Sequence, residues 1–232
     1  MIKTTPLESL HIQLGAEFTE YYGWTMPGSF AGLNDELAGL ANSSAAFDLC
    51  PFSRISVSGS ECGEMITTAF PDMNPVCEDC WEWASNDKHI RIANTSDGYL
   101  IMAHPKVSAA AIERVRSVGE KFNVNIADRT EKTAMIGIYG PNAYQTLSRI
   151  VPLDISGISE KGSVLTLSVF MMSFTVVRGS WLGSDGVELI CPVTAAKFAT
   201  QAIEKYHKRE NIIPAGVTCF DAAFEKYVFE TV

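Results

Sequence analysis

Strand-like segments joined by tight turns constrain the fold of this chain more than any other feature. The turn at 94–98, between the strand segments 89–93 and 99–103, reads Asn-Thr-Ser-Asp-Gly, a run of turn-forming residues. Helical patterns are interspersed in pairs between the strands, which favours an α+β fold with mainly antiparallel sheets flanked by helices. The clearest strand segments are 54–58, 81–84, 89–93, 99–103, 164–170, 172–178 and 187–191.

Apolar residues at helical spacing predict the helices. Leu7, Leu10 and Leu14 repeat on one face of a short helix over 6–14, and a second amphipathic pattern ends near Asn42. Further helices are predicted to begin near Ser60, to cover 107–122 and 194–206, and to start at Pro141.

Charge and hydropathy exclude several classes of protein. The net charge is -9, and the one basic cluster, 205–209, fits a helix end rather than a nucleic-acid surface. The apolar run 168–177 is too short to span a bilayer, and residues 1–16 lack the apolar core of a secretory signal. We therefore expect a cytoplasmic protein with neither nucleic acid nor membrane as a partner.

The six cysteines are expected to be reduced and mostly buried. Cys77-x-x-Cys80 leaves three interpretations open: half of a zinc site with His89 and His104, a redox pair, or two structural thiols. A thioredoxin-type pair would follow a strand and open a helix, whereas this pair precedes an aromatic strand. We expect two structural thiols and no metal.

Four stretches, in order, carry a family resemblance. The opening stretch, 5–30, reads TPLESLHIQLGAEFTEYYGWTMPGSF, and the loop at 178–188 reads RGSWLGSDGVE. The others are the strand, Gly-Pro and helix start of 133–144, and Ile-Pro-Ala-Gly at 213–216. Together they resemble the folate-binding N-terminal region of glycine-cleavage T-proteins, the aminomethyltransferases, over nearly the whole chain.

That resemblance implies a fold and a ligand. It implies a first subdomain of residues 1–50 plus 134–232, an inserted second subdomain of 51–133, and a tetrahydrofolate cavity between them. A pterin carries a 2-amino group and a ring N–H on one edge, and a buried carboxylate can accept a hydrogen bond from each. Glu188 matches the Glu of the family's loop segment, so the resemblance implies that it is this carboxylate. Trp181 and Trp83 fall where the family has pocket-lining tyrosines, and Arg178 is expected to pair with Asp185 or with a folate carboxylate. Each also has a structural interpretation, as an edge-strand Glu, core tryptophans and a solvated Arg.

The chain departs from the family at several positions. The family's catalytic Asp follows a double glycine that is missing here; Asp87 stands nearest to it, although a shift of one residue places Lys88 there. The family's pocket-lining Tyr and Asn correspond to Ile92 and His104, and two arginines of its last helix are replaced by Phe220 and Phe224. The sequence ends before the family's C-terminal barrel.

The resemblance implies a folate-binding, one-carbon transferase-like protein whose reference reaction is aminomethyl transfer to tetrahydrofolate. The alternative is a non-catalytic folate-binding or scaffold subunit, or half of a split enzyme, that has lost the catalytic acid. Partners implied are folate, a lipoyl-carrier protein, or a separate chain supplying the C-terminal domain. In the last case the apolar residues Phe220, Phe224, Tyr227 and Phe229 would form the interface.

Overall fold

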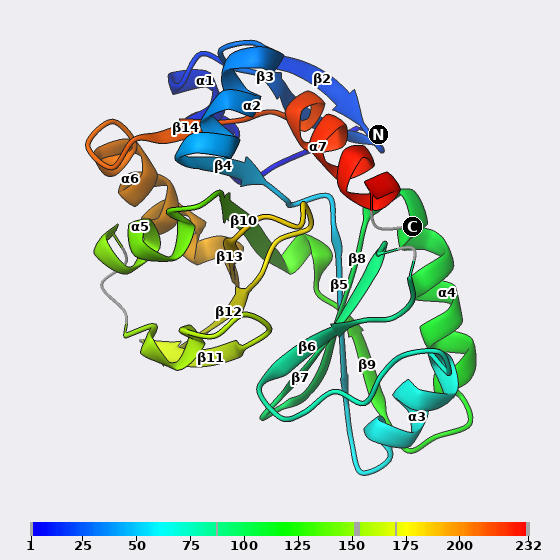
Figure 1. Cartoon of the computed structure of the whole chain (residues 1–232). Coiled ribbons are helices and arrows are strands. Elements are labelled where there is room, and N and C mark those ends of the chain that lie inside the picture. Colours follow the sequence, from blue (N-terminus) through cyan, green and yellow to red (C-terminus); the bar gives the residue numbers. More distant parts are fainter. Residues whose placement is uncertain (1, 87, 151–153, 170, 231–232) are drawn as a thin grey trace.

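The computed structural model describes residues 2–86, 88–150, 154–169 and 171–230. The described residues form three sheets and the helices that flank them (Figure 1). The helices are α1 (Glu8–Gln13), α2 (Leu33–Asn42), α3 (Cys62–Ala69), α4 (Ser108–Gly119), α5 (Ala143–Ile150), α6 (Ala196–Tyr206) and α7 (Val217–Glu230). The predicted α+β class is confirmed.

A six-stranded sheet lies at the centre of the chain's larger part. Its order is β11 (Val164–Val169), β12 (Met172–Arg178), β13 (Gly186–Pro192), β10 (Thr133–Tyr139), β4 (Ser44–Asp48) and β14 (Ile212–Pro214). Neighbouring strands are antiparallel except for the β4–β14 pair. β12 has the predicted bounds; the predicted end of β11, Phe170, lies outside the described residues.

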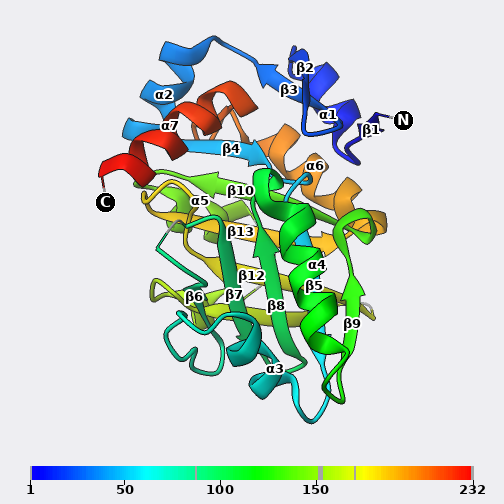
Figure 2. The same cartoon turned by 90° about the vertical axis from the view of Figure 1, so that its right-hand side faces the viewer.

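A five-stranded antiparallel sheet is built entirely from one stretch of the chain. Its order is β6 (Cys80–Trp83), β7 (Ile90–Thr95), β8 (Gly98–Ala103), β5 (Ser53–Ser58) and β9 (Asn125–Asp128). Helices α3 and α4 cover one face, and the six-stranded sheet lies behind the other (Figure 2). Because the strands of the other sheets come from the flanking segments, we propose the subdomain division at residues 50/51 and 133/134.

No pattern in the sequence predicts the N-terminal sheet. It orders β1 (Lys3–Thr4), β3 (Trp24–Ser29) and β2 (Glu17–Tyr21). Four of the five β2 residues are exposed, so no apolar alternation marks the strand. β3 contains Pro27 and Gly28, both of which weaken a strand prediction. β14, at the edge of the six-stranded sheet, and β4 beside it were also not predicted.

Helix α7 crosses β3 and ties two of the sequence motifs together. The backbone of Gly216 approaches that of Gly28 so closely that a Cβ at Gly216 would lie 2.2 Å from the Gly28 carbonyl oxygen. Tyr21 Oη donates a hydrogen bond to Asp221 at 2.8 Å. The prediction that Phe220 and Phe224 lie at an exposed interface is wrong, because both pack in the largest hydrophobic core cluster, 2% and 5% exposed.

Candidate functional site

A buried ion pair joins the two large sheets. Glu188, on β13 between β12 and β10, is fully buried, as is Arg91 on β7 of the five-stranded sheet. The Arg91 guanidinium donates to Glu188 Oε2, and Tyr139 Oη donates to Glu188 Oε1 at 2.6 Å. Both carboxylate oxygens of Glu188 therefore already have donors from this chain.

Three indoles surround the Arg91 guanidinium. Its Cζ lies 4.2 Å from the ring centroid of Trp181, 4.7 Å from that of Trp81 and 5.5 Å from that of Trp83. Distances below about 6 Å are typical of cation–π attraction, which is strongest where water is excluded. Trp83 and Trp181 also meet edge to face, with centroids 5.4 Å apart. Trp181 is fully buried, and Trp83 is partly buried.

Strand alternation explains why Arg91 faces this site. Successive side chains of a strand point to opposite faces. On β7, Ile90 and Ile92 pack into the cluster that contains residues of α3 and α4, so Arg91 points to the other face, toward the six-stranded sheet. Arg91 is paired across the ladder with Trp83 of β6, which places both side chains on that face.

A glycine beside Glu188 makes room for the tyrosine. Gly137 of β10 is the ladder partner of Glu188. A Cβ at Gly137 would lie 2.8 Å from Tyr139 Cζ, so the phenol ring lies over this residue and reaches the carboxylate. Because Gly137 has no side chain, the Tyr139 ring can lie over it, and the Tyr139 hydroxyl reaches Glu188 Oε1.

Burial dominates the electrostatics of the site. Burial raises the pKa of the Glu188 carboxyl, and the Arg91 charge and the two hydrogen bonds counteract part of that rise. The pKa of Tyr139 is raised well above its ordinary value by burial and by the neighbouring Glu188 charge. The ion pair carries no net charge, so a charged ligand would find no uncompensated partner in it.

His104 lies at the far end of the same aromatic cluster. Phe52 connects the two regions, with ring centroids 4.8 Å from Trp181 and 5.1 Å from His104. His104 stacks on Phe224 at 4.9 Å and lines a cavity of about 180 Å³ beside α7. Its Nδ1 accepts from the Lys106 amide, its buried Nε2 has no partner among the residues that the structure describes, and burial lowers its pKa to about 3. His104 is thus a neutral ring with its second nitrogen available.

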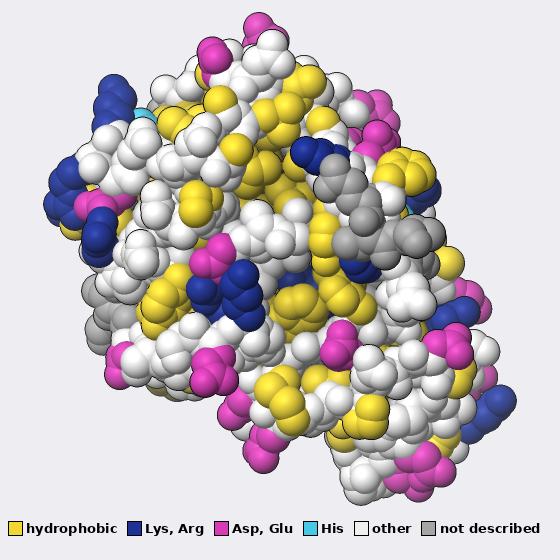
Figure 3. All heavy atoms as spheres, in the orientation of Figure 1, with side chains coloured by type: hydrophobic (Ala, Val, Ile, Leu, Met, Phe, Trp, Pro, Cys, Tyr) yellow, Lys and Arg dark blue, Asp and Glu magenta, His cyan; other side chains and the backbone are white. Residues whose placement is uncertain are grey.

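One face of the molecule carries an apolar region (Figure 3). In the orientation of Figure 1, hydrophobic side chains gather along the middle of the molecule, between the segments at the top and the five-stranded sheet at lower right (Figure 3). Basic side chains are visible among them (Figure 3). A buried carboxylate, indole rings and a neutral His are the residue types that bind a flat ring with polar edges. Glu188 already accepts hydrogen bonds from Arg91 and Tyr139.

Comparison with known families decides the chain's relationship. The profile of the family described as GCVT N-terminal domain matches residues 87–228. This chain belongs to the GCVT N-terminal domain family. The match includes Arg91, Tyr139, Trp181 and Glu188.

Relatives of the GCVT chain are aminomethyltransferases. The aminomethyltransferase of Thermosipho melanesiensis is 24% identical over 242 residues, covering 95% of this chain and 62% of the relative. That of Thermotoga neapolitana is 27% identical over 212 residues, covering 84% and 56%. The chain therefore spans less than two thirds of each relative's length.

Solved structures share the fold of this GCVT chain. Aminomethyltransferase T of the glycine cleavage system from Bartonella henselae matches with a TM-score of 0.80 at 17% identity, over 97% of this chain and 62% of that one. A chain of heterotetrameric sarcosine oxidase from Corynebacterium sp. U-96 matches with a TM-score of 0.56 at 10% identity, over 76% and 91%.

The structure brings some predicted site residues together and separates others. Glu188, Trp181 and Trp83 converge, and His104 joins them through the aromatic cluster. Arg178 does not: its ladder partner is Val187, next to Glu188, so it points to the opposite face of the sheet. There it is buried and its guanidinium makes two hydrogen bonds to the Asp185 carboxylate. Pairing with Asp185 was one of the three outcomes left open, beside pairing with a folate carboxylate and simple solvation.

Two further predictions need comment. Asp87, the candidate catalytic acid, lies outside the described residues. Ile92 does not face Glu188, because strand alternation turns it into the core under α3 and α4. Arg91, one residue earlier, takes the position that faces Glu188 and the six-stranded sheet. A charged residue between two isoleucines signalled this, but only the second sheet makes that face buried.

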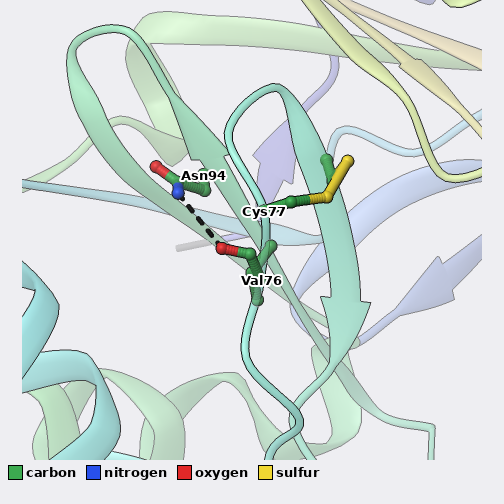
Figure 4. Close-up of a disulfide and its surroundings, with 4 residues drawn as sticks. Val76, Cys77 and Asn94 are labelled. Atoms are coloured by element: carbon green, nitrogen blue, oxygen red, sulfur yellow. Dashed lines mark hydrogen bonds between the residues drawn. A yellow bond between two sulfur atoms is a disulfide. The ribbon is translucent and has the colours of Figure 1, made fainter.

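The expectation of two separate thiols is wrong for Cys77 and Cys80. Their sulfurs form a disulfide, with Cα atoms 5.4 Å apart, in the loop leading into β6 (Figure 4). The Asn94 side chain donates to the Val76 carbonyl at 3.2 Å and fixes the loop against β7 (Figure 4). The cysteines at 50, 62, 191 and 219 are free, and all but Cys62 are buried, as expected.

Two other features are reported for the described residues. They contain no cluster of three or more His, Cys, Asp or Glu side chains arranged to hold a metal ion. Within the same ranges, no helix has the length and apolar character needed to cross a membrane.

Proposed function

We propose that this chain is a folate-binding, one-carbon transferase-like protein whose reference reaction is aminomethyl transfer to tetrahydrofolate. The observation that carries the proposal is the buried Glu188 carboxylate with Trp181 and Trp83 beside it. Family membership and aminomethyltransferase relatives over most of the chain support it. We extend the proposal to a cytoplasmic location and a lipoyl-carrier protein as donor.

The chemistry of a pterin fits these residue types. Its 2-amino group and ring N–H lie on one edge, and a carboxylate accepts both in a charge-assisted pair. Indoles supply large flat surfaces for the ring. In this proposal Glu188 orients the pterin, the tryptophans exclude water, and His104 lines the path toward α7. Asp87 is the proposed acid near the reacting folate nitrogen.

A non-catalytic folate-binding or scaffold subunit is the second candidate. The hydrogen bonds that Arg91 and Tyr139 already make to Glu188 favour it, because a pterin edge would have to displace at least the guanidinium. A separate chain that completes the site is the remaining form of this alternative. In either form we expect no transfer by this chain alone.

Calorimetry with tetrahydrofolate tests the proposal. We expect binding by the wild type that Glu188→Ala weakens by about 2 kcal/mol or more, the cost of losing a charged hydrogen-bond partner. Glu113→Ala, an exposed residue on α4, is the matched control and should leave binding unchanged. Binding without ammonia release from an aminomethyl-loaded lipoyl carrier would support the non-catalytic candidate. Absence of binding by folded wild type would refute the folate proposal.

A further inference from the structure

We infer that Arg91 occupies the subsite of the pterin edge beside Glu188 and acts as an internal competitor that limits binding of a pterin there. The inference rests on the proposed folate function of the Glu188 site. It adds a specificity-determining residue that lies on a strand of the other sheet, 97 positions away in the sequence.

Chemical likeness is the first argument. The carbon that bears the 2-amino group of a pterin is bonded to three nitrogens, so that edge is itself a cyclic guanidine unit. A guanidinium is likewise planar, with its N–H donors in one plane, and pairs with carboxylates in a fixed geometry. Arg91 donates to Glu188 in the way that the pterin edge is proposed to do.

Stacking is the second argument. The guanidinium Cζ lies 4.2 Å from the ring centroid of Trp181, and the rings of Trp81 and Trp83 lie around it. An aromatic wall that holds a guanidinium also suits a flat heterocycle, because both bury a planar π face. Carboxylate and wall together form one subsite, and Arg91 fills it.

Incomplete hydrogen bonding is the third argument. Among the described residues, Arg91 Nε and Nη1 and Trp181 Nε1 are buried and have no hydrogen-bond partner. Buried donors without acceptors are rare, because each forfeits its hydration. The guanidinium therefore satisfies Glu188 but is not itself fully satisfied, as expected for an occupant that a better-matched ligand can displace.

Removing the guanidinium tests the inference. Arg91→Ala opens the subsite, and Arg91→Thr does so with a residue that favours a strand, in case the alanine variant does not fold. Arg91→Met is the matched control, because its unbranched side chain keeps the space filled without donors. Tetrahydrofolate binding is measured by calorimetry on all four proteins. Ethylguanidine is the second probe: a rise in the thermal midpoint of Arg91→Ala shows that the open subsite persists.

We expect Arg91→Ala or Arg91→Thr to bind tetrahydrofolate at least about tenfold more tightly than wild type, a difference of about 1.4 kcal/mol. Arg91→Met should show no gain. Equal affinity in wild type and in the opened variants overturns the inference and leaves the folate proposal standing. If ethylguanidine stabilises Arg91→Ala but neither wild type nor any variant binds tetrahydrofolate, both the inference and the folate proposal fail.

Discussion

Breaking the Arg91–Glu188 pair from one side should be costly, and the cost should depend on which side is removed. Both side chains are fully buried, so a single substitution leaves an uncompensated charge between the sheets. Loss of one partner of a buried pair typically costs about 3–5 kcal/mol. We expect Glu188→Leu to reach that range, because the guanidinium left behind cannot release its proton in the pH range of folding.

Arg91→Met should respond differently to pH. Burial raises the pKa of Glu188, and without Arg91 the carboxyl can escape its charge by taking a proton. A folded-state pKa above the unfolded value stabilises the fold fully below the unfolded pKa, and this contribution is lost as pH rises through the folded pKa. The stability deficit of Arg91→Met should therefore shrink as pH falls from 8 to about 5, whereas that of Glu188→Leu should not.

Urea unfolding followed by near-ultraviolet circular dichroism is the assay, because three indoles surround the pair. The free energy of unfolding is measured at several pH values for wild type, both single variants and the double variant Arg91→Met/Glu188→Leu. The double variant should be more stable than either single one, since it leaves no unpaired charge. Additive losses, or equal pH dependence of the two single variants, would refute the reasoning.

Three other predictions concern the rest of the fold. Alkylation of the denatured, unreduced protein should label four cysteines, and six labelled cysteines would contradict the disulfide. Reduction should lower the free energy of unfolding in urea by about 2 kcal/mol, because the four-residue loop between Cys77 and Cys80 is then no longer closed in the unfolded chain. Burial alone would raise the pKa of Asp48, but its contacts with His11, Cys50 and Thr5 lower the pKa overall. In acid unfolding, the wild type should therefore lose more stability than Asp48→Asn as the pH falls below about 3.8. Gly216→Ala should lower the thermal midpoint strongly because its Cβ would meet backbone atoms. Gly63→Ala in α3, where the nearest atom to the added Cβ is the Tyr99 hydroxyl oxygen at 3.7 Å, should leave the midpoint unchanged or higher.

The candidate site was only partly predictable from the sequence. Glu188, Trp181 and Trp83 were placed in it by family resemblance, and the structure brings them together. The isoleucines on either side of Arg91 indicate only that it faces away from the core of its own sheet, as a solvated residue would, and Tyr139 reads as the ordinary end of a strand. Both join the site because of partners 97 and 49 positions away in the sequence.

The sequence by itself determined the elements with strong periodicity and the family of the fold. Alternation indicated β5, β11 and β12, because a half-buried strand repeats every two residues, and the turn at 94–98 marked β7 and β8. Tertiary structure decided which faces meet. Strand alternation places Arg91 and Ile92 on different faces of the five-stranded sheet. Whether the face that carries Arg91 meets water or Glu188 depends on how the two sheets pack. Polar β2 and the Pro-Gly strand β3 likewise became strands through pairing and through contact with α7, which no local pattern encodes.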